Sequence, residues 1–216
     1  MSDREADADR LSAAALQAGD PTGWFEPLYA EAAQGRAVIP WDRGGPHPLL
    51  VEWAETRTAP APGGRALVVG SGPGSDAAFL AGLGWAVTGF DVAPSAVAAA
   101  QHRFADAGVD FQVADVLDPP ADWSGTYDLV LESYTVQALP VELRPTVISR
   151  VRGFVAPGGT LLVLAAAEDA HNEAGPPWPL TRGEIESFAG DGLAVVQIEE
   201  LGTADARRWR AEFRRS

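Results

Sequence analysis

The chain has 216 residues, of which 46% are hydrophobic and 21% are charged, enough for one domain with a buried core. Thirty acidic against sixteen basic residues give a formal net charge of −14. Because such a surface repels phosphate groups, we expect no binding to nucleic acid or to an anionic membrane surface. The absence of cysteine excludes disulfides, thiolate metal sites and cysteine nucleophiles. The apolar runs are too short for a membrane span and residues 1–10 are acidic, unlike a signal peptide, so we expect a cytoplasmic protein.

The N-terminal quarter of the chain has the pattern of an interrupted helical region. Amphipathic spacing and punctuation by proline and glycine predict three helices and one rigid segment: helices over residues 11–17, 24–33 and 49–55, and the segment 40–48. We expect residues 1–60 to form a helical lid and residues 61–216 to form one compact α/β unit.

The middle of the chain alternates short apolar runs with helical stretches. The pattern predicts strands over residues 65–69, 85–90, 109–113, 127–131 and 160–164, and helices over residues 76–83, 94–105 and 141–154. Several of these strands are apolar on both faces, as in a sheet covered by helices on both sides. The alternation therefore predicts an α/β fold with a doubly wound, mostly parallel sheet.

The C-terminal part is predicted as a helix over residues 181–188 followed by two strands, 194–199 and 207–213, joined by a short loop. In the last strand Trp209, Ala211 and Phe213 alternate with charged residues, the pattern of a half-buried strand. We expect an antiparallel hairpin at the edge of the sheet. We expect the arginines of its last strand to lie on a solvated face.

The most informative motif is the glycine-rich turn after the first predicted strand, Gly70-Ser71-Gly72-Pro73-Gly74-Ser75-Asp76. Such a turn lets the backbone approach a ligand and leaves free N–H groups at the start of a helix. Alone it fits NAD, FAD or S-adenosylmethionine (SAM). Ser75 replaces the third glycine of the dinucleotide motif, and Asp76 in the first helical turn would repel a pyrophosphate. Since SAM carries an ammonium and a sulfonium group, the motif favours SAM over NAD.

Two acidic residues follow the next two predicted strands. Asp91, followed by Val92, ends the second strand, where a carboxylate can accept both hydroxyl groups of a ribose. Asp115 ends the third strand, where it suits the amino group of adenine, and the backbone N–H of Val116 suits a ring nitrogen. The alternative for each aspartate is helix capping or solvation at a strand end. Their occurrence at consecutive strand ends, behind the glycine turn, favours ligand binding.

Taken together, the segments 70–76, 127–132 and 157–159, with Asp91 and Asp115, resemble the class I SAM-dependent methyltransferases. The resemblance covers residues 65–216. It implies a seven-stranded sheet whose last two strands form the hairpin, and SAM as cofactor with S-adenosylhomocysteine (SAH) as product.

A narrower resemblance lies before the first strand. Residues 40–49 are similar to the P-W-D-x-G-x-x-x-P-L segment of the thiopurine S-methyltransferase superfamily, which includes thiol and halide methyltransferases, and residues 139–140 and 175–180 are similar to other segments of that group. The resemblance implies that Trp41, with Trp24 and Tyr29, lies over the bound SAM, where an aromatic face attracts the sulfonium. The alternative is that these rings anchor the N-terminal helices to the sheet.

The chain departs from the family where the fourth strand ends. Glu132-Ser133-Tyr134 stands where relatives have Asp-Tyr-Thr, and Ser71 stands where many have cysteine. Ser133 is expected beside the cofactor. Glu132 either holds the amino group of SAM or acts as a base, with Tyr134 as its neighbour. His47 is a further catalytic candidate at the mouth of the site, and His171 lies in a loop that resembles a lid.

These features predict a SAM-dependent methyltransferase with a small-molecule acceptor, shaped by residues 24–48, 133–140 and 168–180. A thiol or another soft nucleophile needs no strong base, whereas a hydroxyl or amine does. The family resemblance favours S-methylation, and O- or N-methylation stays open. The alternatives are a non-catalytic SAM-binding regulator and an NAD(P)-dependent oxidoreductase. We expect no metal site, and a monomer or weak homodimer.

Overall fold

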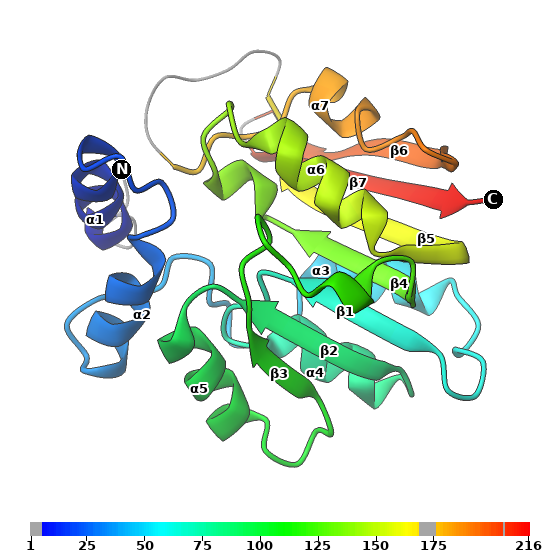
Figure 1. The fold of residues 1–216 in the computed structure, drawn as a ribbon, viewed down its shortest axis with the longest axis horizontal. Helices are drawn as coiled ribbons and strands as arrows, with labels where there is room; N and C mark the ends of the chain where they lie inside the picture. Colours follow the sequence, from blue (N-terminus) through cyan, green and yellow to red (C-terminus); the bar gives the residue numbers. More distant parts are fainter. Residues whose placement is uncertain (1–5, 169–175, 205) are drawn as a thin grey trace.

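A computed structural model describes residues 6–168, 176–204 and 206–216. Within these residues seven strands form one sheet in the order β3-β2-β1-β4-β5-β7-β6 (Figure 1). The strands are β1 (Arg65–Val69), β2 (Ala86–Asp91), β3 (Asp110–Val113), β4 (Tyr127–Ser133), β5 (Val155–Ala166), β6 (Leu193–Thr203) and β7 (Ala206–Arg215). Strands β1 to β5 pair in parallel, and β7 pairs antiparallel with both β5 and β6. The predicted fold class is confirmed.

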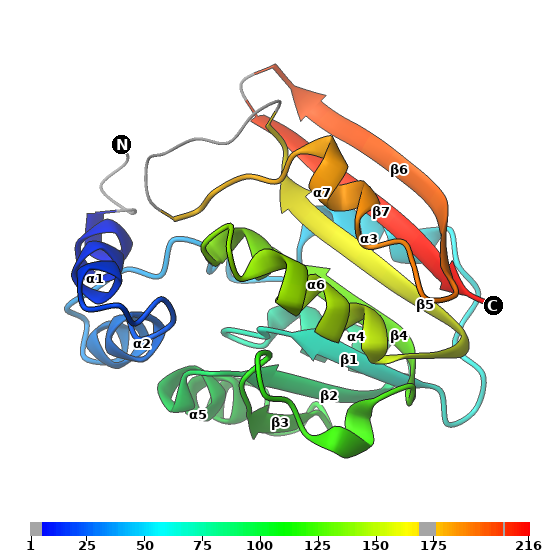
Figure 2. The same ribbon diagram turned by 45° about the horizontal axis from the view of Figure 1, so that its top comes forward.

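Helices cover both faces of the sheet, as the two-sided hydrophobicity of the strands predicts. The helices are α1 (Ala6–Gln17), α2 (Phe25–Ala33), α3 (Pro48–Glu55), α4 (Ser75–Gly82), α5 (Pro94–Arg103), α6 (Arg144–Gly153) and α7 (Arg182–Glu186). Helices α6 and α7 pack on one face of the sheet, and α3, α4 and α5 pack on the other (Figures 1 and 2). Each face has its own cluster of buried hydrophobic residues.

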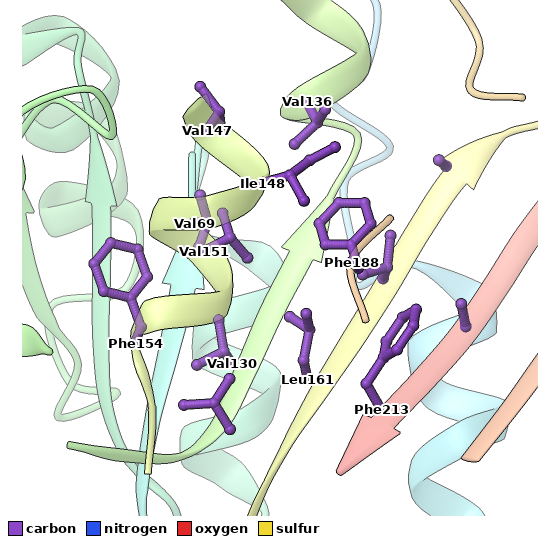
Figure 3. Packing of buried hydrophobic residues seen from close by; sticks show 14 of the residues in the cluster. Val69, Val130, Val136, Val147, Ile148, Val151, Phe154, Leu161, Phe188 and Phe213 are labelled. Carbon is purple, nitrogen blue, oxygen red and sulfur yellow. The ribbon is translucent and has the colours of Figure 1, made fainter. Parts of the chain in front are cut away.

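Figure 3 shows the α6 face, where Val147 and Val151 of the helix belong to one buried cluster with Val69 of β1 and Val130 of β4. These four side chains are buried, with exposed fractions of 0%. This packing fixes α6, and with it the loop before the helix, against the ends of the central strands. That loop reaches the site described below.

Several boundaries differ from the predicted ones, among them the start of α1, at Ala6 rather than at residue 11, and the end of β6, at Thr203 rather than at residue 199. Helix α6 begins at Arg144 rather than at residue 141, because residues 141–143 form a turn before the proline of its first helical turn. Strand β5 begins five residues earlier than predicted, because an irregularity in the β4–β5 register accommodates its Pro157-Gly158-Gly159 segment. Two 3₁₀ turns, η1 (Ala121–Trp123) and η2 (Val136–Ala138), were not predicted.

The hairpin β6–β7 has the predicted pattern, since Trp209, Ala211 and Phe213 are all buried against the α6 face. Strand β7 lies between β5 and β6, so β6 forms the sheet edge. No helix among the described residues is long and apolar enough to cross a membrane.

The N-terminal helices do not form one layer. Helices α1 and α2 lie beyond the sheet edge at which the parallel strands end (Figure 1). Glu26 ties α2 to the start of α5, since its carboxylate accepts hydrogen bonds from the backbone N–H and the hydroxyl of Ser95 at 2.9 and 2.6 Å. Helix α3 instead packs Leu50 and Trp53 into the core of the sheet. The lid role of residues 1–60 and the division at residue 60 stay predictions.

Candidate active site

A cavity of about 320 Å³ lies at the carboxyl ends of the parallel strands. This is where open α/β sheets bind ligands. The glycine turn, the ends of β2, β3 and β4, and the aromatic N-terminal segment all line it. Fourteen of the sixteen predicted site residues are brought together there: Trp24, Tyr29, Trp41, His47, Gly70, Ser71, Gly72, Asp76, Asp91, Val92, Asp115, Val116, Ser133 and Tyr134. Gly74 and Glu132 are not among the lining residues.

The glycine turn is folded so that other segments close over it. Gly70 and Gly72 have φ angles of 57° and 49°, which side chains with a Cβ rarely adopt. A Cβ on Gly70 would lie 2.4 Å from the hydroxyl of Thr135, and one on Gly72 would lie 2.8 Å from the hydroxyl of Tyr29. Gly74, the N-cap of α4, faces Phe111 instead, so its absence of a side chain serves packing.

Asp91 ends β2 and is buried at 7% exposure. Its carboxylate accepts hydrogen bonds from the backbone N–H groups of Gly72, at 2.9 Å, and Ala93, at 3.0 Å. Burial raises the pKa of Asp91 to about 6 and outweighs these hydrogen bonds, which lower it. The residue therefore holds the glycine turn in place while it also lines the cavity.

Asp115 lies after β3 at the same edge. Its Oδ1 accepts a hydrogen bond from the backbone N–H of Leu117 at 2.8 Å, the local capping that was the alternative for this residue. The carboxylate still borders the cavity beside the buried Val116. Asp115 thus makes the local contact and remains available for a ligand.

Asp76 joins the glycine turn to the N-terminal segment. It lies in the first turn of α4, as predicted, and its Oδ1 accepts a hydrogen bond from the backbone N–H of His47 at 2.7 Å. Burial raises its pKa, while the hydrogen bonds from His47 and Ser133 lower it. Both sides of the cavity are therefore linked through one carboxylate.

An aromatic wall closes the cavity on the side of α2. The indole Nε1–H of Trp41 donates a hydrogen bond to the hydroxyl of Tyr29 at 2.8 Å. Trp24 meets Trp41 edge to face, with ring centroids 5.9 Å apart, and packs into a small cluster with Leu28 of α2 and Ala8 of α1. Burial raises the pKa of Tyr29 well above its ordinary value, so its hydroxyl stays protonated. The rings both border the cavity and anchor the N-terminal helices.

His47 borders the cavity without being available as a base. Its Nδ1 accepts a hydrogen bond from the backbone N–H of Leu49 at 3.1 Å and caps α3. Burial, together with the positive charges of Arg43 and Arg208, lowers the pKa of His47 to about 4. The neutral ring therefore carries its proton on Nε2, and that nitrogen can only donate. The ring lies 5.2 Å from that of Tyr134.

Glu132 lies at the end of β4 as predicted, but it is not among the residues that line the cavity, and its two proposed roles stay predictions. It is fully buried at the end of β4, and its Oε1 accepts hydrogen bonds from the backbone N–H groups of Thr135 and Val136 at 2.8 and 2.9 Å. Its Oε2 has no hydrogen-bond partner among the described residues, and burial raises its pKa to about 7. The contacts that are present hold the η2 turn and do not reach into the cavity.

Arg43, Thr135 and Gln137 line the cavity within the segments 24–48 and 133–140 that were predicted to shape the acceptor site, whereas Arg208 was not predicted there. Arg208 corrects the expectation that the arginines of β7 lie on a solvated face, because its end of the strand borders the cavity. Thr135 and Gln137 belong to the unpredicted η2 region. The hydroxyl of Thr135 donates to the carbonyl of Val69 at 2.9 Å. His171 of the predicted lid loop lies outside the described residues.

The cavity lining carries charges of both signs. Asp76, Asp91 and Asp115 lie at the glycine turn and at the ends of β2 and β3, and the basic lining residues are Arg43 and Arg208. The Oγ atoms of Ser71 and Ser75 are buried there without partners among the described residues. Carboxylates suit the ammonium and hydroxyl groups of SAM and disfavour a diphosphate. The residues present therefore fit SAM.

Comparison with known proteins gives a family match over most of the chain. The family model described as thiopurine S-methyltransferase matches residues 32–214. The chain is similar to "Thiocyanate methyltransferase 1" of Arabidopsis thaliana, with 29% identity covering 76% of this chain and 72% of that protein. It is similar to "Probable thiol methyltransferase 2" of the same plant, with 29% identity covering 84% of this chain and 81% of that protein. Among solved structures, the N-methyltransferase NodS of Bradyrhizobium japonicum with bound SAH has a TM-score of 0.70 at 20% identity, covering 88% of this chain and 98% of that one.

Proposed function

The chain belongs to the thiopurine S-methyltransferase family, as its motifs predicted, and from this premise we propose that it methylates the sulfur of a small thiol. It is a methyltransferase that uses SAM and acts on small molecules. When bound, SAM supplies a methyl group on a positively charged sulfur, which is already activated for displacement. The protein's task is then to align the acceptor and exclude water.

The part of the cavity lined by the three aspartates is proposed to hold the cofactor. Asp91 would accept hydrogen bonds from the ribose hydroxyls, and Asp115 with the N–H of Val116 would receive the adenine. The glycine turn would pass beneath the amino acid tail, near Asp76. Trp41 would present its ring to the sulfonium, where an aromatic face is attractive. The placement of all these groups in one cavity supports these assignments.

The observation that carries the thiol assignment is that neither of the two bases predicted from the sequence, His47 and Glu132, is free beside the cavity. The Nδ1 of His47 is occupied by the N–H of Leu49, and Glu132 does not line the cavity. Asp76 is engaged by the N–H of His47. A thiol ionises in water near pH 8.5 or below, so it does not depend on such a base, whereas a hydroxyl or an amine does.

The test is a matched acceptor panel. Thiophenol, phenol and aniline share a ring and differ in the acceptor atom, and formation of SAH with each can be followed by mass spectrometry. We expect methylation of thiophenol alone. Faster methylation of phenol or aniline would contradict S-methylation, and binding of SAM without methylation of any acceptor would favour a regulator. NADH is expected not to bind.

Three further properties are proposed from the sequence. The charge of −14 supports an enzyme that avoids nucleic acid and anionic membranes. We further propose that it acts in the cytoplasm, and as a monomer or weak homodimer. Light scattering at several concentrations would measure the oligomeric state.

A further inference from the structure

The part of the cavity around Tyr134 is lined by groups that donate hydrogen bonds. Arg43 and Arg208 are cations, and the Nε2 of the neutral His47 carries a proton. Tyr134 adds a buried hydroxyl, whose pKa is raised by burial and lowered by the nearby charges of Arg208 and Arg43. Four donors that converge on one place call for an acceptor group, and the strongest acceptor for arginine is a carboxylate.

Arg208 differs from the arginines on either side of it along β7. Arg207 pairs with Glu200 at 2.8 Å, and Arg210 pairs with Glu199 at 2.8 Å. Arg208 donates a hydrogen bond to the carbonyl of Arg207 and lies close enough to Tyr134 to lower the pKa of its hydroxyl, and it forms no salt bridge with a described carboxylate. The chain has fourteen more acidic than basic residues, so an arginine has many possible partners within it. A partly buried arginine that pairs with none of the described carboxylates therefore indicates a binding site for the carboxylate of a ligand.

Arg43 reaches the same place from the N-terminal segment. Its guanidinium lies over the ring of Tyr134, with 5.4 Å to the ring centroid. The neighbouring Asp42 contacts Arg103 at 3.3 Å, and Arg43 makes no salt bridge within the described part of the chain. Asp76 is close enough for the charge of Arg43 to lower its pKa, but its Oδ1 is hydrogen bonded to His47.

The backbone conformation of Tyr134 also indicates a ligand site. Its φ angle is 64°, a left-handed conformation that is an outlier for a bulky residue and is therefore strained. The backbone holds it because the N–H of Tyr134 donates to the carbonyl of Leu164 at 2.9 Å. Strain of this kind clusters at ligand sites, and the ring of this strained residue lies beside both His47 and Arg43.

We propose that Arg208 and Arg43, with the hydroxyl of Tyr134, bind a carboxylate carried by the acceptor, so that the enzyme prefers thiols with an acidic substituent. The proposal rests on the proposed function, because it names the class of that acceptor. The cofactor also has a carboxylate, but the sheet order separates β7 from β1 by β4 and β5. Three strand spacings amount to roughly 14 Å, which sets Arg208 apart from the glycine turn.

The test compares 4-mercaptobenzoate with its methyl ester, which share the ring and the thiol and differ in the negative charge. For the native enzyme we expect kcat/KM to favour the acid by about tenfold or more, the range for a hydrogen bond between charged groups. Arg208→Gln should lower this acid-to-ester ratio about tenfold, and Arg43→Gln should lower it less because Arg43 is exposed. Arg208→Lys should keep part of the preference. Arg214→Gln, on the same face of β7 at its far end, should leave the ratio unchanged.

A second readout does not need turnover. Benzoate and benzamide have similar shapes and differ in charge, and their binding to the protein–SAH complex can be followed by tryptophan emission. We expect benzoate to bind more tightly than benzamide, and Arg208→Gln to remove the difference while the affinity for SAH is kept.

Several results would overturn the proposal. Equal kcat/KM for acid and ester, or equal binding of benzoate and benzamide, excludes a carboxylate subsite. Equal losses for acid and ester in Arg208→Gln would assign the arginine to the acceptor sulfur, and a large loss of SAH affinity would assign it to the cofactor's carboxylate. If neither thiol is methylated, the proposed function fails, and the comparison of benzoate with benzamide still decides the subsite.

Discussion

The carboxylate of Asp76 and the backbone N–H of His47 form a hydrogen bond of 2.7 Å between two segments that are 29 residues apart. Asp76 belongs to the first turn of α4, directly behind the glycine turn, and His47 is the N-cap of α3. The bond therefore joins the two motifs by which the family is recognised. It also explains an aspartate that would be unfavourable next to a diphosphate.

The first prediction concerns this bond. Asp76→Ala removes the acceptor and leaves the buried N–H of His47 unpaired, which costs about 1–3 kcal/mol. We expect about tenfold or more loss of affinity for SAH, measured by calorimetry, and a lower melting temperature. Asp106→Ala, at an exposed position of the loop after α5, is the control and should change neither. Unchanged SAH affinity in Asp76→Ala would show that the link does not support the cofactor site.

The second prediction follows from the buried carboxyl of Glu132, whose pKa is raised by burial from 4.5 to about 7. The folded protein then binds a proton that the unfolded chain has lost between about pH 4.5 and 7. Stability contributed by this group is therefore present at low pH and is lost as the pH rises through 7. Asp91, whose pKa is raised to about 6, acts in the same direction.

Glu132→Gln keeps an oxygen that can accept from Thr135 and Val136 and removes the charge. We expect the free energy of unfolding at pH 8 to rise by about 2 kcal/mol, and its slope between pH 5 and 7 to become flatter. Urea denaturation of the cofactor-free protein at several pH values measures both. Glu142→Gln, at an exposed position before α6, is the matched control. A destabilised Glu132→Gln at pH 8 would mean that the ionised carboxylate is required for folding.

The sequence predicted the fold well because its signals are local. Strand β1 is apolar from Ala66 to Val69 and is bounded by glycine, and its predicted range of 65–69 agrees with the structure. The glycine turn and the aspartates at the ends of β2 and β3 are local for the same reason, since a parallel sheet brings strand ends together at one edge.

What the sequence did not predict depends on contacts between distant segments. The alternation in β7 gave the two faces of the strand correctly, but only the packing beyond β5 makes the face of Arg208 part of the cavity. The role of Glu132 depends on the η2 turn, which is too short to have a periodic pattern. For both charged residues, the role depends on which distant segments pack around the side chain.

The third prediction concerns Arg144, which has an exposed fraction of 1% and holds three segments together. It donates to the carbonyls of Leu139 and Trp178, at 3.2 and 2.7 Å, and to the carboxylate of Glu184 at 2.5 Å. Leu139 and the neighbouring Pro177 line or border the cavity, so the arginine positions the walls of the acceptor end.

Arg144→Met removes these bonds and takes away the cation that faces Glu184, so we expect a loss of stability of about 3–5 kcal/mol. Arg144→Lys should recover part of it. We expect Arg144→Lys to displace the cavity walls near Leu139 and Pro177 more than the residues proposed to hold the cofactor. In this variant KM for the acceptor should therefore rise by a larger factor than Kd for SAH. Arg150→Gln, on an exposed position of the same helix, should behave like the native protein. Equal changes in acceptor and cofactor binding would contradict a positioning role confined to the acceptor walls.

The fourth prediction separates two roles of Trp41. The indole N–H donates to Tyr29, and the ring borders the cavity, so the residue can act as an anchor, as a contact for the sulfonium, or as both. SAM is positively charged at its sulfur and SAH is not, and the two otherwise have the same shape. Trp41→Ala should therefore weaken SAM more than SAH, by about threefold to tenfold, if the ring faces the sulfonium.

Trp41→Phe loses the hydrogen bond to Tyr29 and keeps an aromatic face, and Tyr29→Phe loses the same bond while it leaves the indole in place. Both should affect SAM and SAH alike, because breaking the anchor changes the wall and not the charge that it faces. Competition binding with both nucleosides measures the ratio of the two dissociation constants for each variant. A constant ratio in all three variants, Trp41→Ala included, would assign Trp41 to the packing of the N-terminal helices alone.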